Sequence, residues 1–213
     1  MNSTIEFLRR FFLVRKCAVC GAVLGDPGQE NLCRRCGNAF AALKREKCGI
    51  CGQEQSYCRC VRTALFDGIG AEKSVHLFRY KNEFSRKIVY SLKRNGKKSL
   101  IDLLAGELAR TLLFCRGNTD LSRFAVTWVP RSAKNFRKYG FDQSALLAAG
   151  IAGELGLPLC GTLCHTGGKS QKKIAAPERL ANAQSSYRTA QGEQISGKSL
   201  ILVDDVLTTG SRE

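Results

Sequence analysis

Eight closely spaced cysteines near the N-terminus constrain the fold of this chain more than any other feature. They form the pairs Cys17/Cys20, Cys33/Cys36, Cys48/Cys51 and Cys58/Cys60. The first three pairs are C-x-x-C, and Gly21, Gly37 and Gly52 follow them directly. Glycine at this position permits a tight turn that directs backbone N–H groups at the sulfurs. The pattern is typical of a metal site.

Two structural zinc sites of four cysteines each are the simplest interpretation. Tetrahedral Zn²⁺ takes four thiolates, and so short and polar a segment would not fold on apolar burial alone. We expect the first four cysteines to form one site and the last four the other, because each set lies within a hairpin-sized span. Spacing alone is also compatible with interleaved pairing and with iron–sulfur ligation. The narrow spacing of Cys58 and Cys60 makes the second site the less regular one.

The remaining cysteines, Cys115, Cys160 and Cys164, are expected to be small buried apolar side chains. The 213 residues carry 34 Lys and Arg against 18 Asp and Glu, a formal charge of +16. Eight thiolates and two Zn²⁺ would add −8 and +4, leaving about +12 in the metallated protein. Such a charge favours nucleic acid, phosphorylated ligands or an acidic partner, and it does not choose among them.

No stretch approaches the run of about 20 apolar residues that a membrane-spanning helix needs. Glu6, Arg9 and Arg10 interrupt the apolar run of residues 1–16, so a signal-peptide core does not form. This segment is interpreted as a short amphipathic helix. We therefore expect a cytoplasmic protein without a membrane span.

The cysteine-rich composition ends after Cys60, which predicts a domain boundary near residue 62. Residues 1–62 would contain the N-terminal helix and a double zinc ribbon, and residues 63–213 a second domain. Alternation predicts a strand over 71–78. Apolar residues at helical spacing predict a helix through Phe84, Ile88 and Leu92, and another from Ser99 to about Phe114.

The following segment predicts a strand through Trp128 and Val129, then a basic loop, then a helix from about Gln143 to Leu155 that ends at Gly156. Alternating strands and helices predict an α/β domain with a mostly parallel sheet flanked by helices. Residues 169–179 are a candidate lid over an anionic ligand, although composition alone favours a solvated linker.

The last residues read "LILVDDVLTTGSRE". They predict a buried strand over Leu200–Val203, two aspartates at its carboxyl end and a loop that leads into a helix. In open α/β sheets, ligands bind at this end of the strands, and helix N-termini bind anions. Asp204 and Asp205 could accept hydrogen bonds from vicinal hydroxyls while the loop holds a phosphate. For an Asp pair alone, an ordinary acidic turn explains the pattern equally well.

The stretch "LILVDDVLTTGSR" resembles the signature of the type I phosphoribosyltransferases. With the paired cysteines, "RKYGFDQSALLA" and "QKKIAAPERLANA", the chain resembles the ComF family, whose members join a double zinc ribbon to a type I phosphoribosyltransferase-like domain and are linked with DNA uptake in natural competence. The resemblance covers nearly all of the chain. It implies a further helix and strand after Arg212, so the domain is expected to be C-terminally incomplete in this sequence.

The resemblance implies a site for 5-phosphoribosyl 1-diphosphate (PRPP) and Mg²⁺. The two aspartates would hold the ribose hydroxyls, and the Thr-Thr-Gly-Ser loop would hold the 5-phosphate. The loop after the Trp128 strand would hold the diphosphate. Lys93 aligns more loosely with a basic residue that binds the diphosphate in this fold. The implied PRPP-binding residues are Asp204, Asp205, Thr208, Thr209, Gly210, Ser211, Arg131, Ser132 and Lys93, of which Asp204, Asp205 and Arg131 would be catalytic. Tyr139 and Asp142 depart from the family pattern, where Arg and Asn are common.

Two functions are compatible with these features. The favoured one is a ComF-like protein that binds PRPP with Mg²⁺, retains or has lost phosphoribosyl transfer, and acts in DNA uptake. The alternative is a non-catalytic factor that binds single-stranded DNA, or a partner such as a competence helicase, beside a vestigial PRPP pocket. Basic residues mixed with Phe and Tyr in "LFRYKNEFSRKIVYSLKRNGKK" are typical of a single-stranded nucleic-acid surface. The spacing of Phe84, Ile88 and Leu92 suits a core stripe equally well.

Overall fold

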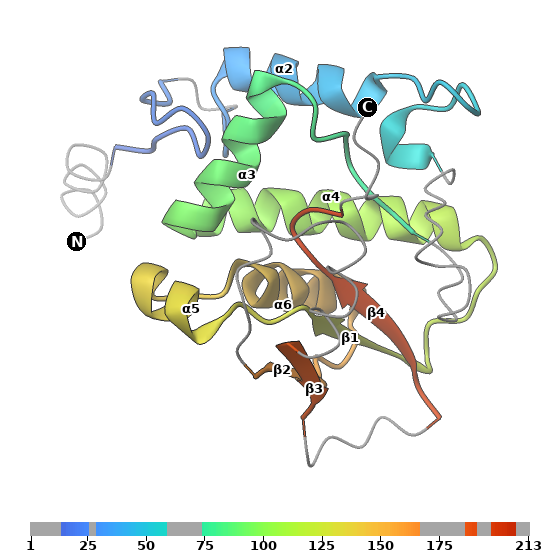
Figure 1. Ribbon diagram of the computed structural model, residues 1–213. Helices are drawn as coiled ribbons and strands as arrows, with labels where there is room; N and C mark the ends of the chain where they lie inside the picture. The colour runs from blue at the N-terminus through green and yellow to red at the C-terminus, as the bar shows by residue number, and fades with distance from the viewer. Residues whose placement is uncertain (1–13, 26–28, 59–73, 167–185, 191–196, 208–213) are drawn as a thin grey trace, which may run out of the picture.

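The computed structural model describes residues 14–25, 29–58, 74–166, 186–190 and 197–207 (Figure 1). The elements are α2 (Arg34–Arg45), the 3₁₀ turn η1 (Gln55–Tyr57), α3 (Glu83–Asn95), α4 (Lys98–Arg116), β1 (Phe124–Trp128), α5 (Ala133–Tyr139), α6 (Gln143–Leu155), β2 (Leu163–His165), β3 (Tyr187–Thr189) and β4 (Ser199–Val203). The predicted N-terminal helix, the boundary near 62, Cys60, the 169–179 lid and the 208–211 loop lie outside the described residues.

Strands β1 and β4 pair in parallel, with Phe124 opposite Ser199 and Trp128 opposite Val203. On the other side of β1, Val126 forms a parallel bridge with Leu159. The predicted parallel sheet is therefore confirmed for these strands, whose flanking helices give the domain its mixed α/β character. Because parallel strands end at the same edge, the loops that follow Trp128 and Val203 lie at one end of the sheet.

The core around the sheet is built by α6, which packs on the β1–β4 pair, and by α4, which packs on α6. Leu104 and Ala105 of α4, Leu147 and Ile151 of α6, and Val126 of β1 are all buried there. The helix predicted from Gln143 to Leu155 is confirmed, including its end at Gly156, where φ is +64°. The helices predicted around Ile88 and from Ser99 are also confirmed, as α3 and α4.

The cysteine-rich region packs on the same core. Lys44 of α2 and Glu107 of α4 form an ion pair at 2.6 Å, and the rings of Tyr57 and Phe114 lie 4.4 Å apart. Buried Phe40 of α2 belongs to the core cluster that includes the residues of α4 and α6. The cysteine-rich region therefore packs against α4.

The strand predicted over 71–78 is wrong for residues 74–78, which have no regular structure. Leu77 is buried, and the ring of Phe78 meets Phe40 edge to face at 6.1 Å. The apolar alternation of this segment therefore serves packing against α2 rather than pairing with a strand. Helices α2 and α5 and the antiparallel β2–β3 pair were not predicted from the sequence.

Of the three isolated cysteines, Cys115 and Cys160 are buried as expected, whereas Cys164 is exposed. It lies on β2, where its thiol donates to the carbonyl of Arg188. None of the helices in the described parts of the chain combines the length and apolar character needed to cross a bilayer.

The contact between α4 and α6 depends on a glycine. A Cβ atom placed on Gly150 would lie 2.7 Å from the Cβ of Ala105. We expect Gly150→Ala to lower the free energy of unfolding by ~1–3 kcal/mol, because the helices must separate. Gly153→Ala on the same helix, where no atom lies within 4 Å, should instead raise it by ~0.5–1 kcal/mol. Urea unfolding of both variants measures this, and equal effects would contradict the close approach.

Candidate functional site

The first cysteine cluster brings Cys17, Cys20, Cys33 and Cys36 together, with their Sγ atoms all within 4.8 Å of one another. The Sγ atoms of Cys20 and Cys33 lie 3.6 Å apart. A tetrahedral Zn²⁺ with Zn–S bonds of 2.3 Å requires about 3.8 Å between sulfurs. The cluster therefore fits a zinc ion, and it groups the first four cysteines as the sequence predicts.

Two different local structures build this cluster. The first pair sits on a short turn closed by the bridge between Lys16 and Val23, where Gly21 has φ +77°. The second pair sits at the start of α2: Cys33 is the N-cap and Cys36 lies in the first turn. Gly37 is a helical residue rather than part of the predicted tight turn, because the free N–H groups at the helix start take the place of that turn.

The backbone around the first cluster favours a thiolate. Burial raises the pKa of Cys17, but backbone hydrogen bonds from Cys20, Cys33 and Val19 outweigh it and lower the pKa to about 6. Burial, followed by hydrogen bonds from neighbouring thiols, raises the pKa of Cys36. A cation held between the sulfurs would offset that crowding of negative charge.

The second cluster contains Cys48, Cys51 and Cys58, again with Sγ atoms within 4.8 Å of one another. The bridge between Lys47 and Glu54 closes its turn. Backbone hydrogen bonds from Cys51 and Ile50 are the main cause that lowers the pKa of Cys48 to about 6. These three sulfurs also fit a zinc ion, and Cys60, the predicted fourth ligand, lies outside the described residues.

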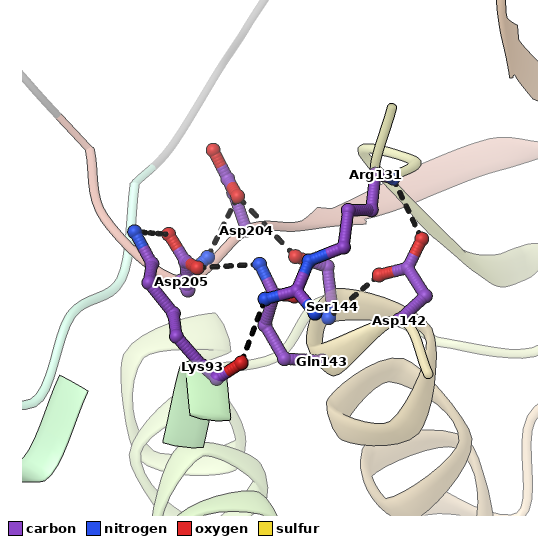
Figure 2. Close-up of polar contacts among 7 residues, drawn as sticks. All are labelled: Lys93, Arg131, Asp142, Gln143, Ser144, Asp204 and Asp205. Carbon is purple, nitrogen blue, oxygen red and sulfur yellow. Dashed lines mark hydrogen bonds and ion pairs between the residues drawn. The ribbon is translucent and has the colours of Figure 1, made fainter. Parts of the chain in front are cut away.

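A second site lies where β1 and β4 end. Figure 2 shows the side chains of Lys93, Arg131, Asp142, Gln143, Ser144, Asp204 and Asp205 converging there. They come from the end of α3, the loop after β1, the start of α6 and the residues after β4. The parallel pairing of the strands explains why segments far apart in the sequence meet at this edge.

Both oxygens of the Asp205 carboxylate have donors. Gln143 Nε2 donates to Oδ2 at 2.6 Å, and Lys93 Nζ lies 3.2 Å from Oδ1. The Asp205 side chain is only 7% exposed, whereas that of Lys93 is 41% exposed. A buried carboxylate requires such compensation, and the partly exposed lysine is the more movable of its two partners.

The neighbouring Asp204 has a different environment. Its Oδ1 accepts from Ser144 Oγ at 3.3 Å and from the backbone N–H of Asp205 at 2.7 Å. The residue as a whole is exposed to solvent, but the loss of water around its carboxyl group, followed by the charge of Asp205, raises the pKa of Asp204 to about 6. Burial, followed by the charges of Asp204 and Asp142, raises the pKa of Tyr187 on β3, so β3 also lies near these two carboxylates.

Arg131 connects three segments of the site through its side chain. Its guanidinium donates to the carbonyl of Phe141 and to the carbonyl of Lys93, both at 2.9 Å. It lies over the rings of Tyr139 at 4.7 Å and Phe141 at 5.3 Å. These contacts join the loop after β1 to the end of α3 and to the loop before α6.

Asp142 joins the same loops from the other side. Its carboxylate accepts from the backbone N–H of Arg131 at 2.7 Å and caps α6 by accepting from the N–H groups of Ser144 and Ala145. Sequence reasoning noted Asp142 only as a departure from a family pattern. An Asp directly before an apolar helix is an N-cap signal that would have identified this role.

The structure brings four of the predicted site residues together: Lys93, Arg131, Asp204 and Asp205. Ser132 instead caps α5, where its Oγ accepts from the N–H of Asn135 at 3.4 Å. Comparison of the chain with known protein families, with curated proteins and with solved structures finds no match. The chemistry of the site therefore rests on its own residues.

The metal sites generate one prediction. We expect the purified protein to carry about two zinc ions, and Cys17→Ser to lose about one of them and to lower the unfolding midpoint, because the remaining thiolates close the site incompletely. Cys164→Ser, which removes an exposed thiol outside both clusters, is the control and should keep both ions. Metal analysis of the three proteins tests this; iron in place of zinc, or equal loss in both variants, would contradict it.

The raised pKa of Asp204 leads to a prediction about stability and pH. The folded protein holds this proton more tightly than the unfolded chain, where the pKa is near 3.8, so the contribution of this group to stability falls as the pH rises from about 4 to 6. We expect Asp204→Asn to be more stable than the wild type at pH 8, and the small difference to vanish near pH 4. Urea unfolding across this range measures it, and a difference independent of pH would contradict the assignment.

Proposed function

We propose that this chain is a ComF-like protein that binds PRPP, with Mg²⁺, at the end of β1 and β4. The observation that carries the proposal is the convergence of Asp204 and Asp205 with Lys93 and Arg131 at one edge of a parallel sheet. A carboxylate pair suits vicinal hydroxyls, and the cations beside it suit phosphate groups. The motif "LILVDDVLTTGSR" supports the same assignment.

The proposed site divides into two halves. Oδ2 of Asp204, and Oδ1 of Asp205 once Lys93 has left it, would accept hydrogen bonds from the ribose hydroxyls. Lys93 would move from Asp205 to the diphosphate, because its amino group is the exposed cation of the site. Arg131 would act mainly by bracing the end of α3 through its contact with the Lys93 carbonyl.

The chemistry follows from the charge on the ligand. When the C1–O bond breaks, its electron pair leaves with the diphosphate and positive charge builds on the ribose, while an acceptor nucleophile bonds to C1. Carboxylates beside the ribose and cations beside the diphosphate stabilise that distribution. Carboxylate and diphosphate oxygens are the ligands that Mg²⁺ prefers, and the bound ion would neutralise charge on the leaving group.

In this proposal the cysteine clusters hold structural zinc. The first has four thiolates, which leave no open position for a substrate. Both clusters belong to the region fixed against α4, and their role would be to hold that region folded.

A second candidate function has its own observation. Tyr90 of α3 and Phe136 of α5 are 57% and 49% exposed, and Arg94 donates to the hydroxyl of Tyr90 and lies over its ring. The buried stripe of α3 contains Ile88 and Leu92, so the aromatic and basic residues occupy its outer face. Exposed rings beside cations are typical of surfaces that bind single-stranded nucleic acid, which suits a role in DNA uptake.

The PRPP proposal is tested by calorimetric titration of Mg²⁺-PRPP, followed in parallel by the fluorescence of Trp128, the last residue of β1. We expect saturable binding that weakens by about 100-fold in Asp204→Asn/Asp205→Asn and by about tenfold in Lys93→Met. Lys98→Met, which removes an exposed lysine that pairs with Asp102 one turn along α4, is the control. Absence of binding to the wild type would overturn the proposal.

The nucleic-acid candidate is tested by fluorescence anisotropy of a labelled single-stranded oligonucleotide. We expect Arg94→Ala to weaken binding and to flatten its salt dependence, because one phosphate contact is lost. Arg123→Ala removes the same charge just before β1, at the opposite end of the sheet, and should have little effect. Equal losses in the two variants would indicate attraction by net charge alone.

A further inference from the structure

Gln143 is a buried residue of the acidic site to which neither the family resemblance nor the composition assigned a role. It is the first residue of α6 and is only 8% exposed. Its Nε2 donates to Asp205 Oδ2 at 2.6 Å, opposite the oxygen that Lys93 holds (Figure 2). A carboxylate held at both oxygens by donors from two helices has a fixed plane.

The start of α6 is itself fixed, so this amide approaches Asp205 from a rigid base. The Asp142 carboxylate binds the backbone N–H groups of Arg131, Ser144 and Ala145. The loop after β1 and the first turn of α6 are thereby joined immediately before Gln143. The position of the Gln143 amide follows from this junction.

The remaining half of the amide group is unsatisfied. Gln143 Oε1 is buried and has no hydrogen-bond partner among the described residues. A buried acceptor without a donor destabilises the folded state. An apolar side chain of similar size would fill the same space without a buried, unsatisfied acceptor. The advantage of an amide at this position is therefore its hydrogen bond to Asp205.

The orientation of the amide also follows from Asp205. An ionised carboxylate only accepts hydrogen bonds, so the NH₂ half must face Asp205 and the oxygen must face away. The hydrogen bond to Asp205 therefore determines which way round the Gln143 amide lies.

We propose that Gln143 is the positioning residue for Asp205. It holds Oδ2 of the carboxylate in place while Lys93 leaves Oδ1, so that Oδ1 is presented to the ligand in one orientation. Gln143 acts through Asp205 and does not itself contact the ligand. This inference rests on the proposed function, in which Asp205 binds the ribose of PRPP.

Two variants separate positioning from a structural role. Gln143→Met keeps the size of the side chain and removes both the donor and the unsatisfied acceptor. We expect it to weaken Mg²⁺-PRPP binding about tenfold while the unfolding midpoint stays within a few degrees of the wild-type value. Gln53→Met, at an exposed position near the second cysteine cluster, is the control.

Gln143→Glu adds a pH readout. At pH 8 the introduced carboxylate repels Asp205, and we expect weak binding. As the pH falls, a proton shared between the two carboxyls restores a donor, so affinity relative to the wild type at the same pH should recover. The other charged groups that act on Asp205 are Lys93 from α3, Arg131 from the loop after β1 and Asp204 after β4. Asp142, before α6, acts on the same Arg131, and all four groups are unchanged in the variant.

The outcomes are distinguishable. If Gln143→Met binds Mg²⁺-PRPP as tightly as the wild type, the positioning role is overturned and the proposed function remains. The same conclusion follows if Gln143→Glu loses the same amount of affinity at every pH. Absence of binding to the wild type would overturn the proposed function, and this inference with it. If Gln143→Met does not fold, the pH profile of Gln143→Glu decides.

Discussion

The buried carboxylate of Asp205 is the constraint on which the arrangement of α3, α6, β1 and β4 depends. A charged group with 7% of its side chain exposed is tolerated only where donors replace the water it has lost. Those donors come from α3 and α6, and β4, which ends two residues before Asp205, pairs with β1. The hydrogen bonds that stabilise this one buried carboxylate therefore form only where α3, α6, β1 and β4 meet at one edge of the sheet.

The cysteine-rich region is connected to this edge of the sheet through α3. Arg79 donates to Cys48 Sγ, and Asn82, three residues later, caps the start of α3 with its side chain. Lys93 lies at the other end of the same helix, where Arg131 holds its carbonyl. The second cysteine cluster therefore lies near the start of α3 and the acidic site lies at its end. The buried face of α3 packs on the core and fixes the position of the helix.

The sequence predicted those parts of the structure that local chemistry determines. The bounds of α6 follow from an apolar pattern between an Asp and a Gly, and the cysteine clusters follow from ligand spacing. Alternating strand and helix signals predicted a mostly parallel sheet, although not which of its strands pair. These features depend on residues close together in the chain, and each has few physical interpretations.

The features that the sequence did not predict depend on tertiary contacts. The 74–78 segment has strand-like alternation but packs on α2, so burial overrode its propensity. The guanidinium of Arg131 was assigned to a ligand, whereas its contacts are to the carbonyls of Lys93 and Phe141. Gln143 lies in the block "RKYGFDQSALLA" that carries the family resemblance, but the sequence assigned it no role, because its contact with Asp205 arises only when two segments distant in sequence are brought together.

The most direct test of the account is an NMR titration of the Asp204 side-chain carboxyl carbon in the free protein and in the presence of Mg²⁺-PRPP. If the acidic pair is the ligand-binding centre, Asp204 titrates near pH 6 in the free protein, and its pKa falls when hydroxyl donors and a cation surround it. An identical titration curve with and without a saturating amount of the ligand would contradict the account.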